Sequence, residues 1–220
     1  EPLYRPGDGR LEFGWERQTF FEAQSMPSVS FQGRVNRKAG REAPDAWRDV
    51  SGVGTLVHTL TNGFPYDVVA SFTRFRALRD DGLSIVFDGL TTPPERGSRS
   101  FGWATVSLDG QRVFEATDVS VTQARTQPFV GGTVTYPVPH AYEVTARHGD
   151  DWLLVRVYDG EIVSAESPFA RVSAFLRAVL GALMSPYDFE LSVRYDAWVH
   201  IDGQTAQVAG RGWSTSNFTR

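Results

Sequence analysis

The chain has 220 residues, a formal net charge of −4 and no cysteine. Hydrophobic residues make up 41% and charged residues 22%, which is ordinary for a folded globular protein. The basic residues form no stripe, so no nucleic acid is expected as a partner. No apolar run approaches the roughly 20 residues that cross a bilayer, so no integral membrane segment is expected. The absence of cysteine excludes disulfides and thiolate chemistry.

In chain order, apolar runs separated by turn signals predict about ten antiparallel strands. The first hairpin joins residues 28–35 to residues 53–60 through a long segment. Later hairpins are predicted at Asp81-Gly82, Asp109-Gly110 and Asp202-Gly203, and a fourth turn at residues 148–151. Asp-Gly between two strand-like runs is a strong hairpin signal, because a two-residue type I′ turn requires positive φ at both central positions.

Residues 167–186 predict the one helix of the chain. Ser167 is a preferred N-cap, Pro168 suits the first helical position, and Pro186 ends the pattern. Apolar residues recur at helical spacing over about 168–184 and define one broad stripe that must be buried. The helix is expected to pack on the β-structure, where it covers a sheet edge, plugs a barrel end or forms a lid.

The segment 188–203, DFELSVRYDAWVHIDG, alternates apolar and polar residues as a half-buried strand does. A two-residue turn at Asp202-Gly203 predicts these facing pairs: Val199 with Ala206, Ala197 with Val208, Tyr195 with Gly210 and Val193 with Gly212. On this register Arg194 faces Arg211, which is unfavourable unless Asp196, Glu190 or an outside anion lies between them.

These elements predict an all-β fold, a single domain over residues 1–220 in which an antiparallel meander closes into a β-barrel. A β-sandwich is the alternative. So many twisted strands tend to curl shut or to split into two sheets. The architecture resembles the lipocalin-like proteins, and the closing segment GRGWSTSNFTR resembles the last strand of the lipocalin-like hydratase and cyclase families. The resemblance is one of fold and assigns no functional residue.

The apolar face of the sheet either packs a filled core or lines a cavity. Gly210 and Gly212 beside Tyr195 leave space, which other side chains or a ligand would fill. Barrels of eight or more strands can enclose a small molecule. An apolar small molecule is therefore the expected partner. The sequence does not decide between a monomer and a homodimer.

No sequence motif identifies a type of reaction. None of the four histidines has metal-ligand spacing, and the chain has no G-x-S-x-G, phosphate loop or dinucleotide fingerprint, so no metal and no cofactor are expected. His58 shares a face with Leu56 and Leu60 and is expected to point into the apolar interior. It is either a structural histidine satisfied by one hydrogen bond or an acid–base group tuned by burial.

The leading hypothesis is an enzyme, independent of cofactors, that folds a polyketide- or terpenoid-like molecule for cyclisation, isomerisation or hydration, because such catalysis can rest on shape and orientation. The predicted catalytic residues are His58 and Tyr195, and the predicted substrate-binding residues are Trp103, Tyr142, Phe189 and Val193. The alternatives are a carrier without chemistry and an interaction or carbohydrate-binding module that uses Trp198. A cytoplasmic location is expected. The chain starts with neither a Met nor a signal-peptide pattern, which predicts a trimmed or processed chain and leaves export open.

Overall fold

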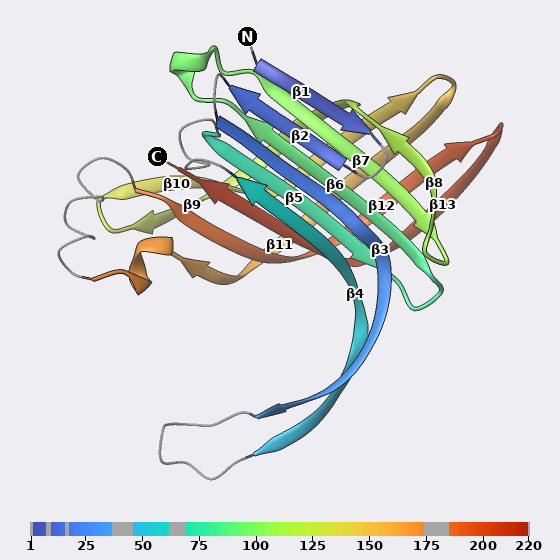
Figure 1. The fold of residues 1–220 in the computed structure, drawn as a ribbon, viewed down its shortest axis with the longest axis horizontal. Helices are drawn as coiled ribbons and strands as arrows, with labels where there is room; N and C mark the ends of the chain where they lie inside the picture. The colour runs from blue at the N-terminus through green and yellow to red at the C-terminus, as the bar shows by residue number, and fades with distance from the viewer. Residues whose placement is uncertain are drawn as a thin grey trace.

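A computed structural model describes residues 2–7, 10–15, 18–36, 46–61, 69–173 and 185–219, and for 2–30, 53–61, 123, 124 and 171 it gives the backbone alone. Antiparallel strands dominate (Figure 1). The strands are β1 (Pro2–Gly7), β2 (Arg10–Trp15), β3 (Gln18–Asn36), β4 (Trp47–Thr61), β5 (Ser71–Leu78), β6 (Leu83–Thr91), β7 (Ser100–Leu108), β8 (Gln111–Ala116), β9 (Asp118–Gly131), β10 (Val134–His148), β11 (Asp151–Glu166), β12 (Tyr187–Ile201) and β13 (Gln204–Phe218). Two short 3₁₀ helices span Pro94–Arg96 and Pro168–Arg171.

The strands form two sheets. The smaller has the order β1-β2-β3-β4, and the larger has the order β8-β7-β6-β5-β13-β12-β11-β10-β9. The larger sheet curls until β7 lies against β9, where a Cβ on Gly102 would lie 2.7 Å from the Cβ of Val119. The predicted all-β, barrel-like fold is confirmed with one correction. Within the described strands the backbone ladder stays open between β8 and β9, so the barrel has a seam held by side chains.

The seam arises where the chain passes from β8, at one edge of the larger sheet, to β9, at the opposite edge. The sequence predicts one strand over residues 111–121, but β8 ends at Ala116 and β9 begins at Asp118. From there the chain pairs with β10, with Val119 opposite Ala146. The crossing at Thr117 carries no glycine or proline, and this explains why the sequence pattern does not show it.

The predicted Asp-Gly turns connect neighbouring strands of the meander. Asp109 and Gly110 have φ values of 51° and 78°, and Asp202 and Gly203 have 51° and 75°, as type I′ turns require. The turn at Asp81-Gly82 is longer than predicted. There the Arg79 N–H donates to the Leu83 carbonyl at 2.9 Å, and only Gly82 has positive φ.

The predicted register of β12 and β13 is confirmed, including Tyr195 opposite Gly210 and Arg194 opposite Arg211. The acidic group near these two arginines comes from neither Asp196 nor Glu190. A register shift in β11 places Asp159 so that its Oδ2 lies 3.9 Å from Nη1 of Arg194. This carboxylate offsets part of the like-charge repulsion, although all of these side chains are largely exposed.

The concave face of the larger sheet packs a continuous apolar core. Its buried members come from seven of the nine strands, while β9 and β13 add partly buried residues at its border. The buried members include Phe75, Ile85, Phe87, Val106, Phe114, Tyr136, Val144, Leu153, Phe189, Leu191 and Tyr195. The ring of Tyr195 meets that of Phe75 edge-on with centroids 5.4 Å apart. The middle of this face is therefore a filled core, and the cavity described below lies at the seam.

The predicted helix over about 168–184 begins as expected but does not continue as one helix. The Ser167 side chain accepts a hydrogen bond from the Phe169 N–H at 3.3 Å, as an N-cap does. The turn that follows is a 3₁₀ helix, and Val172 returns to an extended conformation with φ −92° and ψ 161°. Residues 174–184, which carry most of the predicted apolar stripe, lie outside the described residues.

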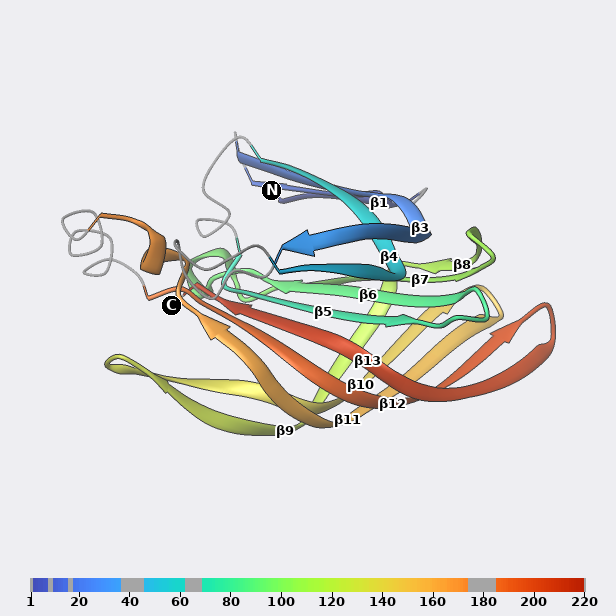
Figure 2. The same cartoon turned by 90° about the horizontal axis from the view of Figure 1, so that it is seen from below.

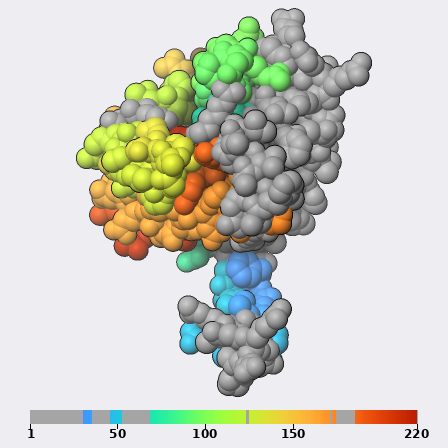
Figure 3. Space-filling view, turned by 90° about the vertical axis from the view of Figure 1, so that its left-hand side faces the viewer, coloured from blue at the N-terminus to red at the C-terminus, as the bar shows by residue number. Residues whose placement is uncertain are grey.

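The smaller sheet lies across the outer face of β5–β8 (Figure 2). This arrangement agrees with the burial of outer-face side chains on these strands, since Val86, Asp88, Trp103 and Thr105 are each 1% exposed. The strands β6 and β7 are thus buried on both faces, while the outer face of β5 is partly buried. Beyond this layer, β3 and β4 continue as a two-stranded ribbon that projects from the body (Figures 1 and 3).

Candidate functional site

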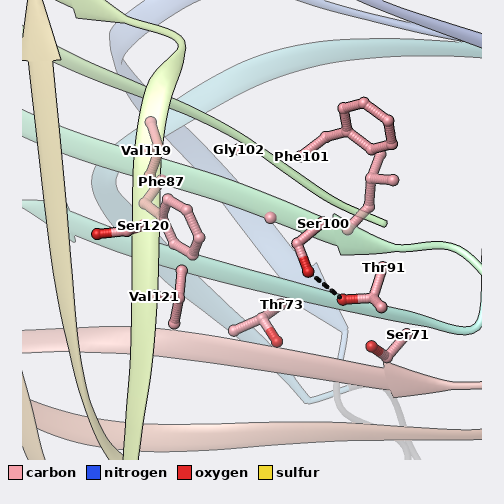
Figure 4. Close-up of a pocket in the computed structure, with 12 residues that line it drawn as sticks. Ser71, Thr73, Phe87, Thr91, Ser100, Phe101, Gly102, Val119, Ser120 and Val121 are labelled. Atoms are coloured by element: carbon pink, nitrogen blue, oxygen red, sulfur yellow. Dashed lines mark hydrogen bonds between the residues drawn. The ribbon is translucent and has the colours of Figure 1, made fainter. Parts of the chain in front are cut away.

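A cavity of about 380 Å³ opens at the seam, between one end of β5–β7 and the start of β9 (Figure 4). A volume of this size suits a small ligand. The residues that line it are Ser71, Thr73, Phe87, Gly89, Leu90, Thr91, Ser100, Phe101, Gly102, Val119, Ser120 and Val121.

Two glycines make room for the apolar wall of this cavity. Gly89 of β6 and Gly102 of β7 face each other across the ladder. A Cβ on Gly89 would lie 2.5 Å from the Phe87 Cζ, and one on Gly102 would meet Val119. Because real Cβ contacts are longer, larger residues at either position would displace the wall. The missing side chains therefore let Phe87 and Val119 form the apolar wall of the cavity.

The polar groups of the cavity are neutral hydroxyls. Ser71 and Thr73 contribute hydroxyls, and the Thr91 and Ser100 hydroxyl oxygens lie 3.4 Å apart, whereas the Ser120 hydroxyl points away from them (Figure 4). None of the lining residues is an acid, a base, a histidine or a tyrosine. The site can thus orient a neutral guest through hydrogen bonds and shape, while acid–base chemistry would need a group from elsewhere.

A row of hydroxyls leads from the cavity into the core. Thr73 on the cavity wall pairs with Ser216 of β13, which is 1% exposed and whose Oγ has no hydrogen-bond partner within the described residues. Two residues away, Ser214 Oγ lies 2.8 Å from the hydroxyl of Tyr142, and both side chains are buried. Burial raises the pKa of Tyr142, so this phenol stays neutral.

Four of the predicted site residues lie on the concave face, and Tyr142 is the one tied to the hydroxyl row. Phe189 and Val193 are buried core residues, 0% and 2% exposed. Tyr195 is fully buried, and its hydroxyl lies near Arg79 without a hydrogen bond of good geometry. Burial raises the pKa of Tyr195, while the Arg79 guanidinium opposes the rise. None of these four lines the seam cavity.

The other two predicted residues lie elsewhere. Trp103 points to the outer face of β7, where its indole Nε1 donates to Glu115 Oε1 at 2.9 Å. His58 belongs to β4, where it pairs with Ala23 of β3, and its side chain lies outside the described residues. The structure therefore does not gather the six predicted residues into one site.

Sequence reasoning missed a charged layer beneath the smaller sheet. Arg74 Nε lies 2.5 Å from Oδ1 of Asp88, whose side chain is fully buried, and Arg112 pairs with Glu115 at 2.9 Å. Asp88 Oδ2 has no hydrogen-bond partner in the part of the chain that the structure describes. Buried charges cost free energy unless they are paired, so this layer constrains how the two sheets meet. The available signal was the alternation of arginine with apolar residues in FTRFRAL.

The described residues hold neither a cluster of metal ligands nor a membrane-spanning helix. No three His, Asp or Glu side chains among them gather as metal ligands would. No helix in the described ranges is long and apolar enough to cross a membrane.

The fold and the open seam define an all-β, barrel-like protein of lipocalin-like architecture. No protein-family model matches the chain, and no curated protein matches it significantly. Among solved structures, it is similar to a protein provisionally assigned as AttH from Nitrosomonas europaea, with a TM-score of 0.51 and 17% identity over 98% of this chain and 68% of that chain. At this identity the similarity shows the fold alone.

Weaker similarity links the chain to CghA. The crystal structure of CghA with Sch210972 gives a TM-score of 0.46 at 11% identity, over 99% of this chain and 73% of that chain. A second CghA structure gives 0.45 at the same identity and coverage.

Proposed function

We propose that the protein binds a small, mainly apolar molecule in the seam cavity and holds it in a shape that favours cyclisation or isomerisation. The observation that carries this proposal is the cavity of about 380 Å³ with an apolar wall and neutral hydroxyls. Binding in one reactive conformation supplies orientation, which can lower a barrier without a catalytic acid or base. Hydration is the less favoured reaction, because it requires proton transfer.

A carrier that performs no chemistry is the second candidate. It is favoured by the lack of any titratable side chain in the cavity lining. Tyr195 and His58 are proposed as orienting groups only for a ligand that extends beyond this cavity. For Tyr195 the support is its buried hydroxyl, which has no hydrogen-bond partner in the described part of the chain.

The binding test uses the neutral apolar dye N-phenyl-1-naphthylamine. We expect saturable binding at one site, and Ser71→Phe, which fills the cavity, should weaken it at least about tenfold. Thr145→Phe is the matched control, because Thr145 lies on the outer face of β10, between the buried Val144 and Ala146. Equal loss in both variants, or no loss in Ser71→Phe, would refute the cavity as the site.

The catalytic test separates enzyme from carrier. Linear polyenes are incubated with the wild-type protein and with Ser71→Phe, and the products are analysed by chromatography and mass spectrometry. A product of unchanged mass that the wild type forms and the variant does not supports cyclisation or isomerisation. Recovery of the unaltered polyene bound to the wild type supports the carrier.

A further inference from the structure

The projecting ribbon of β3 and β4 exposes apolar side chains. Among the described strands, residues 29–36 pair only with residues 47–54, over about 26 Å, and we call these residues the arm. Phe31, Val35 and Trp47 are 49%, 51% and 51% exposed. An isolated two-stranded ribbon is marginally stable in water, and exposed apolar residues of this kind mark interaction surfaces. The arm therefore has the character of an interaction surface.

One face of the arm combines apolar side chains with a positive charge. Cross-strand pairing puts Phe31 opposite Gly52 and Val35 opposite Arg48, on the same face. The Phe31 ring occupies the space above Gly52, where a Cβ would lie 2.9 Å from it. Arg48 is exposed and has no ion-pair partner among the described residues. A matching surface would offer apolar side chains beside a carboxylate.

The β7–β8 hairpin is such a surface. Leu108 and Val113 are 48% and 44% exposed, and Asp109 lies between them at the tip of the hairpin. Strand β8 is also an edge strand, with one paired neighbour. The antiparallel order brings this tip to the same end of the larger sheet as the other Asp-bearing turns (Figure 2), which are at Asp80, Asp81, Asp150, Asp151 and Asp202.

The charges of the two regions are complementary. On the described part of the arm, Arg34 Nε lies 3.4 Å from Asp49 Oδ1, so Arg48 carries the net positive charge. The hairpin tip carries Asp109, and the turns at the same end of the sheet carry five further aspartates. Surfaces of opposite charge attract each other over a Debye length of about 10 Å in dilute salt. A second copy of this chain therefore offers the arm an acidic surface with exposed apolar side chains.

We propose that two copies of the protein form a twofold dimer in which each arm docks on the β7–β8 hairpin of the other. Phe31 and Val35 contact Leu108 and Val113 of the second copy, and Arg48 faces Asp109. Each copy contributes one arm and one hairpin, so two identical contacts complete the assembly, as a dimer with twofold symmetry requires.

The test is a charge exchange followed by analytical ultracentrifugation of the full chain. Arg48→Asp and Asp109→Arg are each expected to weaken the dimer at least about tenfold, because each places like charges at both contacts. An equimolar mixture of the two variants should dimerise as the wild type does, because every contact then joins opposite charges. Phe31→Ser should dissociate the dimer, and the control Val163→Ser, which changes a valine 52% exposed on β11, should not.

Three results would overturn the proposal: a wild-type protein that stays monomeric at about 100 μM, a dimer insensitive to both charge variants, and a mixture that remains as weak as its components. Circular dichroism of each variant separates loss of fold from loss of contact. The dye-binding test is independent of this assembly, since the seam cavity lies within one copy.

Discussion

The buried hydrogen bond between Tyr142 and Ser214 offers a direct test of the filled core. The two hydroxyl oxygens lie 2.8 Å apart, and the residues are 2% and 1% exposed. Tyr142→Phe leaves the Ser214 hydroxyl buried without this partner, and Ser214→Ala does the same to Tyr142. An unsatisfied buried hydroxyl costs about 1–3 kcal/mol, so each single variant should lose that much unfolding free energy.

The double variant should lose less than the sum of the single variants. With both hydroxyls removed, no polar group of this pair is left unsatisfied, and the remaining cost is a void of about two oxygen atoms, about 1 kcal/mol. The coupling free energy should therefore be about 1–3 kcal/mol. Water in an open cavity would instead satisfy either hydroxyl, and the coupling would then be close to zero.

Urea denaturation followed by tryptophan fluorescence measures all four free energies, because none of the six tryptophans is changed. Tyr158→Phe is the control, since Tyr158 is only partly buried and its change should stay within about 0.5 kcal/mol. Strictly additive losses in the double variant would refute the account of the interior as dry and filled.

Three further predictions concern stability. Burial raises the pKa of Asp188 despite the hydrogen bond from Asn217 at 2.6 Å, so its ionised form destabilises the fold, and Asp188→Asn should raise the melting temperature at about pH 7 but not at about pH 3. Gly203→Ala should cost about 1–2 kcal/mol in urea denaturation because its φ is 75°, whereas Gly33→Ala, at an ordinary φ with open space, should not. Asp88→Ala, which leaves the Arg74 guanidinium without its carboxylate, should be less stable to urea than the double variant Asp88→Leu with Arg74→Met.

The sequence predicts the local parts of this fold well, because Asp-Gly turns and period-two alternation are local signals. The turn at Asp202-Gly203 determines the whole register from Val199 opposite Ala206 to Tyr195 opposite Gly210. The crossing at Thr117 depends on which distant strand β9 meets, and no local pattern records that choice. The seam is thus a consequence of long-range pairing.

The cavity was beyond sequence reasoning for a similar reason. Gly89 and Gly102 are thirteen positions apart and become partners only through the ladder between β6 and β7. Large aromatic residues such as Tyr195 and Phe189 suggest a ligand wall, yet they fill the core. As charged residues, Arg74 and Asp88 suggest a solvent-exposed face, but the smaller sheet covers this outer face of β5 and β6. Alternation shows that a strand has two faces but does not show what covers each one.

The seam also determines how a bulky molecule would enter. A fully closed barrel admits a guest only after main-chain hydrogen bonds between neighbouring strands are broken. Here Val119 packs over Gly102, and no ladder joins the described residues of β7 and β9. Separating the two strands therefore gives up apolar contacts and leaves the strand pairing intact. A guest of the proposed kind would pass the rim there without breaking a ladder of the sheet.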